Sequence, residues 1–164
     1  MTEFNLADVF ATVATTIPET DCIVWRDQRL SYGDVAARSN RFARFLADHG
    51  LGCHTERADL AGHESGQDQL ALYLTNGNEY VEAMIGAYGA RVAPFNVNYR
   101  YVAEELRYLL DNAGAKAVVY GSTFASTLAE VRDDLDQLEV LIQVDEGDGT
   151  PLLPGAVDYE AALA

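Results

Sequence analysis

Four short apolar runs alternate along this chain with segments that show the 3.6-residue periodicity of amphipathic helices. The runs cover residues 70–74, 92–95, 117–120 and 140–144. The segments between them are long enough to form crossover helices, and such crossovers are right-handed βαβ units. We therefore predict an α/β fold, with a mainly parallel sheet flanked by helices on both faces.

The clearest helix is predicted over residues 32–46, where apolar side chains return every three or four positions. Ser31 and Asp34 resemble a capping box at its start, and Gly50 is expected to end it. A shorter helix over residues 5–14 has Asn5 as its expected cap. Residues 22–30 indicate a small hairpin that turns at Asp27–Gln28.

Further helices are expected to begin at Asn78 and at Ser122, the second one reaching about Asp133. Gly86 lies inside the first of these helices, so we give it a packing or helix-ending role. Pro94 places the strand over residues 92–95 at a sheet edge or at a strand end. The inner face of the helix after Asn78 is expected to comprise Val81, Met84, Ile85 and Tyr88.

Two regions depart from the alternating pattern. Residues 52–69 carry glycines, acids and histidines without periodicity and indicate an irregular loop within a subdomain that covers residues 1–144. Residues 145–164 form an acidic, turn-rich linker and the start of a helix, which is too short to end a finished domain. We therefore expect the chain to be cut, with a missing remainder as partner and an uncovered apolar face that would form a homodimer.

Charge and composition exclude several classes of partner. Eleven Lys and Arg residues against 26 Asp and Glu residues give a net charge of −15, which repels nucleic acid and anionic lipid surfaces. No apolar run is long enough for a transmembrane segment, and residues 1–5 lack the pattern of a secretory signal. The two cysteines, Cys22 and Cys53, form no disulfide framework, so we expect a cytoplasmic protein.

The usual catalytic motifs are not found. No glycine-rich phosphate loop follows any predicted strand, and neither cysteine has a basic neighbour that would activate it. His54 and His63 lie near Cys53, but their spacing matches no structural zinc pattern, so a solvated loop is the better interpretation. We predict no catalytic residue and no metal ligand in this chain.

Residues 95–101 (FNVNYRY) are unusual because they directly follow a predicted strand. Ligands bind at the carboxyl ends of strands in open α/β sheets, and an Asn, Tyr and Arg cluster there could hold a charged or amide-bearing group. The alternative is a loop in which the asparagines shape turns and Arg100 pairs with one of the many acids.

Six segments, taken in order along the chain, resemble AMP-forming acyl-CoA synthetases and their adenylate-forming relatives. The resemblance extends from about residue 4 to the end of the chain and is carried by 30–43 (LSYGDV, then SNRFA), 74–80 (LTNGNEY), 85–96 (IGAYGARVAPFN), 98–106 (NYRYVAEEL), 111–119 (DNAGAKAVV) and 158–163 (DYEAAL). Each segment is weak alone, but six in sequence identify the chain as similar to the N-terminal third of such an enzyme.

The resemblance implies an N-terminal subdomain of an ATP-dependent acid–thiol ligase, which uses ATP, Mg²⁺ and CoA to make acyl-CoA by way of an acyl-adenylate. The family's phosphate loop and catalytic lysine are not in these 164 residues, so the chain alone should be inactive and should bind none of these cofactors. The residues implied to face the CoA path are Asn96, Asn98, Tyr99, Arg100 and Arg107. A free-standing binding or assembly module, and a fragment of an aryl-acid ligase or another adenylate-forming enzyme, remain as alternatives.

Overall fold

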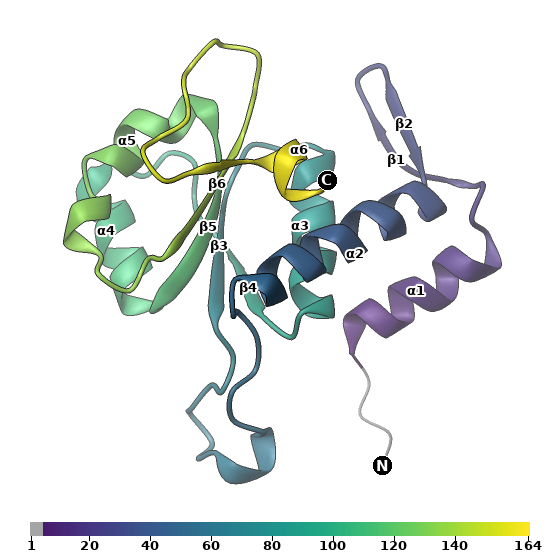
Figure 1. Cartoon of the computed structure of the whole chain (residues 1–164), viewed down its shortest axis with the longest axis horizontal. Helices are drawn as coiled ribbons and strands as arrows, with labels where there is room; N and C mark the ends of the chain where they lie inside the picture. The colour runs from purple at the N-terminus through teal and green to yellow at the C-terminus, as the bar shows by residue number, and fades with distance from the viewer. Residues whose placement is uncertain (1–4) are drawn as a thin grey trace.

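The computed structural model describes residues 5–164, so the expectation about a secretory signal falls largely outside the described residues. It has a two-stranded hairpin and a five-stranded sheet with helices around it (Figure 1). The elements in chain order are α1 (Leu6–Thr16), β1 (Asp21–Trp25), β2 (Gln28–Ser31), α2 (Tyr32–Asp48), η1 (Arg57–Asp59), β3 (Gln69–Tyr73), α3 (Asn78–Gly89), β4 (Ala93–Asn96), α4 (Ala103–Asn112), β5 (Ala115–Gly121), η2 (Ser122–Phe124), α5 (Ala125–Ala129), η3 (Arg132–Asp134), β6 (Val140–Val144), β7 (Val157–Asp158) and α6 (Tyr159–Ala162).

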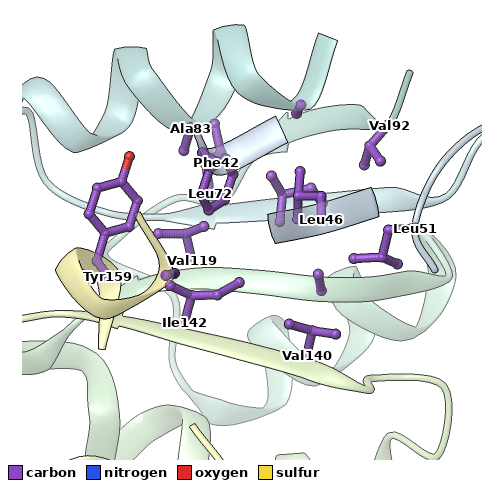
Figure 2. Close-up of a cluster of buried hydrophobic side chains, with 14 of the residues drawn as sticks. Phe42, Leu46, Leu51, Leu72, Ala83, Val92, Val119, Val140, Ile142 and Tyr159 are labelled. Carbon is purple, nitrogen blue, oxygen red and sulfur yellow. The ribbon is translucent and has the colours of Figure 1, made fainter. Parts of the chain in front are cut away.

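The large sheet has the order β4-β3-β5-β6-β7, and every neighbouring pair is parallel. Successive residues of a strand point to opposite faces, so Leu70 and Leu72 pack with α2, α3 and α6, whereas Ala71 and Tyr73 pack with α4 and α5. Figure 2 shows the first of these two apolar clusters. The predicted α/β fold, with a parallel sheet between two helical layers, is confirmed.

Local signals around α2 are confirmed except at the hairpin turn. The Ser31 hydroxyl accepts a hydrogen bond from the Asp34 amide and the Asp34 carboxylate accepts one from the Ser31 amide, which completes the capping box. Gly50 follows the helix with a φ of +77°. The turn, however, lies one residue earlier than predicted. Gln28 pairs with Trp25 and Arg26 takes up the left-handed φ of +52°.

Helix α3 differs from its predicted form in both cap and buried face. Its cap is Gly77, and Asn78 lies inside the helix, where it is buried and donates to Glu82 at 3.0 Å. The buried residues of α3 are Asn78, Glu82, Ala83, Gly86 and Ala87, whereas the large apolar residues predicted for this face are half-buried or exposed. The absence of a side chain at Gly86 has a steric reason, because a Cβ there would lie 2.7 Å from the Ser39 carbonyl oxygen of α2. The packing role predicted for Gly86 is confirmed.

The segment after β5 was wrongly predicted as one helix. It is broken into η2, α5 and η3, and Ser122 is not a helix cap, because its hydroxyl accepts a hydrogen bond from the Glu146 amide at 3.0 Å. Strand β7 was not predicted, since it has only two residues and gains its register from β6. Asp158 then caps α6 through the Ala161 amide. Pro94 lies in the edge strand β4, as expected.

The central strands leave no open apolar face, because β3, β5 and β6 are buried on both sides by this chain's own helices. The expected uncovered face is therefore not on the sheet. Exposed large apolar side chains gather instead on α1 and near the start of α4; they are Leu6, Val9 and Ile17, and Tyr99, Val102 and Tyr108. Within residues 5–164, no helix has the length and hydropathy needed to cross a bilayer.

Candidate functional site

The five parallel strands all end at one edge of the sheet, and polar residues follow four of them. Strand β4 ends at Asn96, β3 leads to Thr75, β5 leads to Ser122 and β6 leads to Asp145. The irregular loop of residues 52–68 leaves the opposite edge, below the sheet in Figure 1. Any site built on strand ends is therefore separated from that loop by the length of the sheet.

The turn after β4 is held by its backbone and by Asn98. The Val97 amide donates to the Leu72 carbonyl at 3.0 Å, which continues the strand pairing by one residue. The Asn98 side-chain oxygen accepts from the Arg100 amide at 3.1 Å, and the Tyr101 amide donates to the Asn98 carbonyl at 3.0 Å. Asn98 thus shapes the turn, as the alternative interpretation of this segment proposed.

Arg100 does not follow that alternative. Its guanidinium carbon lies 5.3 Å from the centre of the Tyr99 ring, and it forms no ion pair with any residue from 5 to 164. Tyr99 is 47% exposed. A guanidinium stacked on an exposed ring keeps its N–H donors free for an anion.

Arg107 lies on α4 beside the same turn. It lines a shallow depression of about 480 Å³ together with Tyr101, Tyr108 and Leu109 and the two acids Glu104 and Glu105. Neither Arg107 nor Asn96 has a side-chain hydrogen bond or ion pair to another described residue. The structure therefore brings Asn98, Tyr99 and Arg100 into one turn and places Arg107 near Tyr101, while Asn96 ends the adjoining strand.

Five of the eleven basic residues are paired with acids: Arg29 with Asp21, Arg38 with Glu82 and Glu160, Arg91 with Glu56, Lys116 with Glu139, and Arg132 with Asp133. Arg100 and Arg107 form no ion pair within residues 5–164, and they share this property with Arg26, Arg41, Arg44 and Arg57. In a protein of net charge −15, a cation without a carboxylate partner is available to a bound anion. This edge of the sheet is therefore a candidate site for an anionic ligand.

Sequence analysis missed a second hollow at the same edge, of about 400 Å³. It lies between the tip of the β1–β2 hairpin, the turn after β3 and the end of β6. Glu146 there accepts hydrogen bonds from the Thr75 hydroxyl at 2.9 Å, from the Thr123 amide at 3.2 Å and from the Thr123 hydroxyl. Burial raises the pKa of the Glu79 carboxyl on the same wall. Applying the strand-end rule to every predicted strand would have found these residues.

Within residues 5–164, no histidine or cysteine lines either of the two hollows described above. His54 Nε2 lies 2.6 Å from Asp68 Oδ2, the Cys53 thiol donates to the Thr55 carbonyl, and His49 stacks on Phe45. In the described part of the chain, no three His, Cys, Asp or Glu side chains are grouped so that they could hold a metal ion.

In open parallel α/β sheets, ligands bind at the carboxyl ends of the strands, which is the edge where Asn96 and Arg100 lie. The family model described as "AMP-binding enzyme" matches residues 10–162, and the chain belongs to that family. The resemblance seen in the sequence is confirmed.

Named relatives agree with this assignment. The medium-chain acyl-CoA ligase Mig of Mycobacterium avium is 54% identical over 163 residues, which are 99% of this chain and 30% of that protein. The 3-oxocholest-4-en-26-oate–CoA ligase of Rhodococcus rhodochrous is 30% identical over 98% of this chain and 27% of its own length. The chain thus spans less than a third of the curated relatives that it matches.

The fold is shared with solved ligases. The crystal structure of the anthranilate CoA ligase AuaEII with anthranoyl-AMP superposes with a TM-score of 0.80 at 14% identity, covering 98% of this chain and 27% of that one. At this identity the likeness concerns the fold alone.

Proposed function

We propose that this chain is the N-terminal portion of an AMP-forming acyl-CoA ligase that converts a carboxylic acid to acyl-CoA through an acyl-adenylate. The observation that carries the proposal is the 54% identity to a medium-chain acyl-CoA ligase over 99% of the chain. That relative also favours a medium-chain acid as substrate over an aryl acid, the alternative left open by the sequence. The protein acts in the cytoplasm in this proposal.

The contribution of this chain in the proposal is to hold CoA, which departs from the sequence-based expectation that the chain alone binds no cofactor. Coenzyme A carries phosphate groups, and Arg100 and Arg107 are cations with no carboxylate partner among residues 5–164. The Tyr99 ring orients the Arg100 guanidinium, Asn98 fixes the turn that bears both, and Asn96 offers an amide at the strand end. These residues bind and position; none of them carries out a chemical step.

ATP and Mg²⁺ do not fit the residues of this chain. No glycine-rich phosphate loop is present in the 164 residues, and the described residues offer no three-ligand cluster for a cation. We therefore place adenylation on the remainder of the longer ligase and expect the chain alone to be inactive. The exposed apolar side chains of α1 provide the surface for the homodimer that we propose.

The test measures CoA binding to the 164-residue chain by isothermal titration calorimetry at low salt. We expect binding that weakens with added salt, because the ion pairs are exposed. Arg100→Gln and Arg107→Gln should each weaken it about threefold to tenfold, the range of exposed to charge-assisted contacts. Dephospho-CoA and pantetheine, titrated in parallel, separate contacts to the phosphates from contacts to the pantetheine arm.

The matched control is Arg29→Gln, which removes an exposed arginine already paired with Asp21 on the hairpin. An equal loss of CoA affinity in all three variants would indicate a general effect of charge and would contradict the proposed site. The same chain, mixed with ATP, Mg²⁺, CoA and octanoate, should form no octanoyl-CoA. Turnover would show that the catalytic groups lie within these 164 residues and would overturn the division of labour proposed here.

A further inference from the structure

A buried carboxylate joins three helices that are distant in the sequence. Glu82 of α3 has no exposed surface. Its Oε1 accepts hydrogen bonds from Arg38 Nε of α2 at 2.8 Å and from the side-chain Nδ2 of Asn78 at 3.0 Å. Its Oε2 accepts from the Tyr159 hydroxyl of α6 at 3.1 Å. Figure 2 shows Tyr159 at one end of the apolar cluster, with its ring packed beside Phe42. The carboxylate is therefore hydrogen-bonded from all sides within the protein.

Arg38 extends the same network to the outer side of α6. Its Nη1 donates to Glu160 Oε2 at 3.0 Å and its Nη2 donates to Glu160 Oε1, so one guanidinium contacts two carboxylates on two helices. The remaining charged groups near this cluster are Glu79 and Arg41. A lysine could not make the same set of contacts, because it lacks the planar fork.

The segment held by this network has little independent stability. Strand β7 pairs with β6 at only two positions, and α6 has four residues, far below the length at which an isolated helix forms. Loop 145–156, which leads to it, contains three glycines with positive φ. The segment is thus fixed by side chains: the apolar contacts of Tyr159, Ala162 and Leu163 and the hydrogen bonds of the Glu82 network.

Apolar contacts alone do not select one orientation of residues 157–163, since hydrophobic burial has no direction. The buried Glu82 carboxylate does select one orientation, because any other docking of this segment leaves the carboxylate without the hydrogen bond from the Tyr159 hydroxyl. We propose that Glu82 is a positioning residue that docks residues 157–163 in a single orientation, and that this segment, edge strand β7 included, opens and closes as a local unit separate from the central strands β5 and β6.

The consequence for the ligase rests on the proposed function. In that reading the polypeptide continues beyond residue 164, and the orientation of α6 sets the direction in which the remaining ligase leaves the sheet. Glu82 would then influence the assembly of the active site without touching substrate or cofactor.

The test is hydrogen–deuterium exchange of the 164-residue chain, read by mass spectrometry on peptides that cover residues 157–164 and, separately, β5 and β6. Glu82→Gln keeps the shape but removes the charge, Tyr159→Phe removes one hydroxyl, and Arg38→Lys keeps the charge but loses the fork. Glu139→Gln is the matched control, since it makes the same chemical change at the exposed Lys116 pair.

We expect each of the three cluster variants to speed exchange in residues 157–164 about tenfold or more, as the loss of a hydrogen bond to a charged group implies. Exchange in β5 and β6 should stay within about twofold, and the control should change neither region. Should Glu82→Gln destabilise the whole protein, the milder Tyr159→Phe variant decides. Unchanged exchange in residues 157–164, or equal acceleration of the strands in Tyr159→Phe, would overturn the proposal. No ligase activity is measured, so the outcome is independent of the proposed function.

Discussion

Gly86 is a buried position where even one added methyl group would collide with fixed atoms of a neighbouring helix. It lies where α3 crosses α2, and a Cβ built there is 2.7 Å from the Ser39 carbonyl oxygen and 2.9 Å from Phe42 Cδ1. Both atoms are constrained, since the first belongs to a helix backbone and the second to a ring with no exposed surface. The Gly86→Ala variant must therefore push the two helices apart.

Two opposing contributions determine how much Gly86→Ala changes the free energy of unfolding. Overpacking of this kind costs about 1–3 kcal/mol, whereas replacing a helical glycine by alanine contributes about 1 kcal/mol to helix stability. The sum is a loss of about 1 kcal/mol, which lowers the melting temperature by about 2–4 °C in a domain of this size. The control is Gly89→Ala in the same helix, where the added Cβ would meet only the Ala43 Cβ at 3.3 Å. That variant should be neutral or slightly stabilising.

The measurement is urea unfolding followed by circular dichroism at 222 nm. Fluorescence of the single tryptophan is less informative here, because Trp25 lies on the hairpin outside the two core clusters. A Gly86→Ala variant as stable as the Gly89→Ala variant would refute the reasoning, since helix propensity alone would then account for both.

Other properties of the chain are open to direct measurement. Hydrogen bonding to Arg38 lowers the pKa of Glu160, so the stability that this contact supplies is present above the ordinary value of 4.5 and is lost as the pH falls through the depressed pKa. In a plot of the urea unfolding midpoint against pH, Glu160→Gln should therefore reduce the fall of the midpoint at acid pH. A fall as steep as in the unchanged protein would exclude the contact. Self-association through α1 should appear as a concentration-dependent sedimentation coefficient that Val9→Lys abolishes, and a monomer at all concentrations would disprove the homodimer. An intact-mass measurement on native lysate should find a polypeptide about three times as long as this chain, as the 30% coverage of the Mig ligase implies, whereas a species of 164 residues would favour the free-standing module.

The elements that the sequence predicted well are those with strong local causes. The capping box of Ser31 and Asp34 is formed by residues three apart, and the strand over residues 140–144 is an apolar run interrupted only by Gln143. Pro94 marks an edge because a proline has no N–H to give to a second neighbour. Such features need no knowledge of what lies across the core.

The errors arise where a distant partner decides. Val81 and Met84 have the expected spacing for the buried face of α3, but α2 approaches so closely at Gly86 that no side chain fits there, and Glu82 is buried through its ion pair with Arg38. Ser122 is a good helix cap in isolation, yet its hydroxyl is taken by the Glu146 amide, 24 residues away. The hydrogen bond from the Tyr159 hydroxyl to Glu82 joins positions 77 residues apart and has no local signature.

In the candidate site, too, local features could be predicted from the sequence and contacts between distant residues could not. The position of the Asn, Tyr and Arg residues directly after a strand, and the family to which they point, follow from the order of residues alone, because strand ends and linear motifs are local. Only the tertiary structure shows that Arg100 stacks on Tyr99 while five other basic residues pair with acids, since pairing depends on which side chains the fold brings within a few ångströms. The sequence by itself thus determined the fold class and the family, because their signals are local, whereas the packing of α2, α3 and α6 decided that the Glu82 carboxylate is buried beside Arg38.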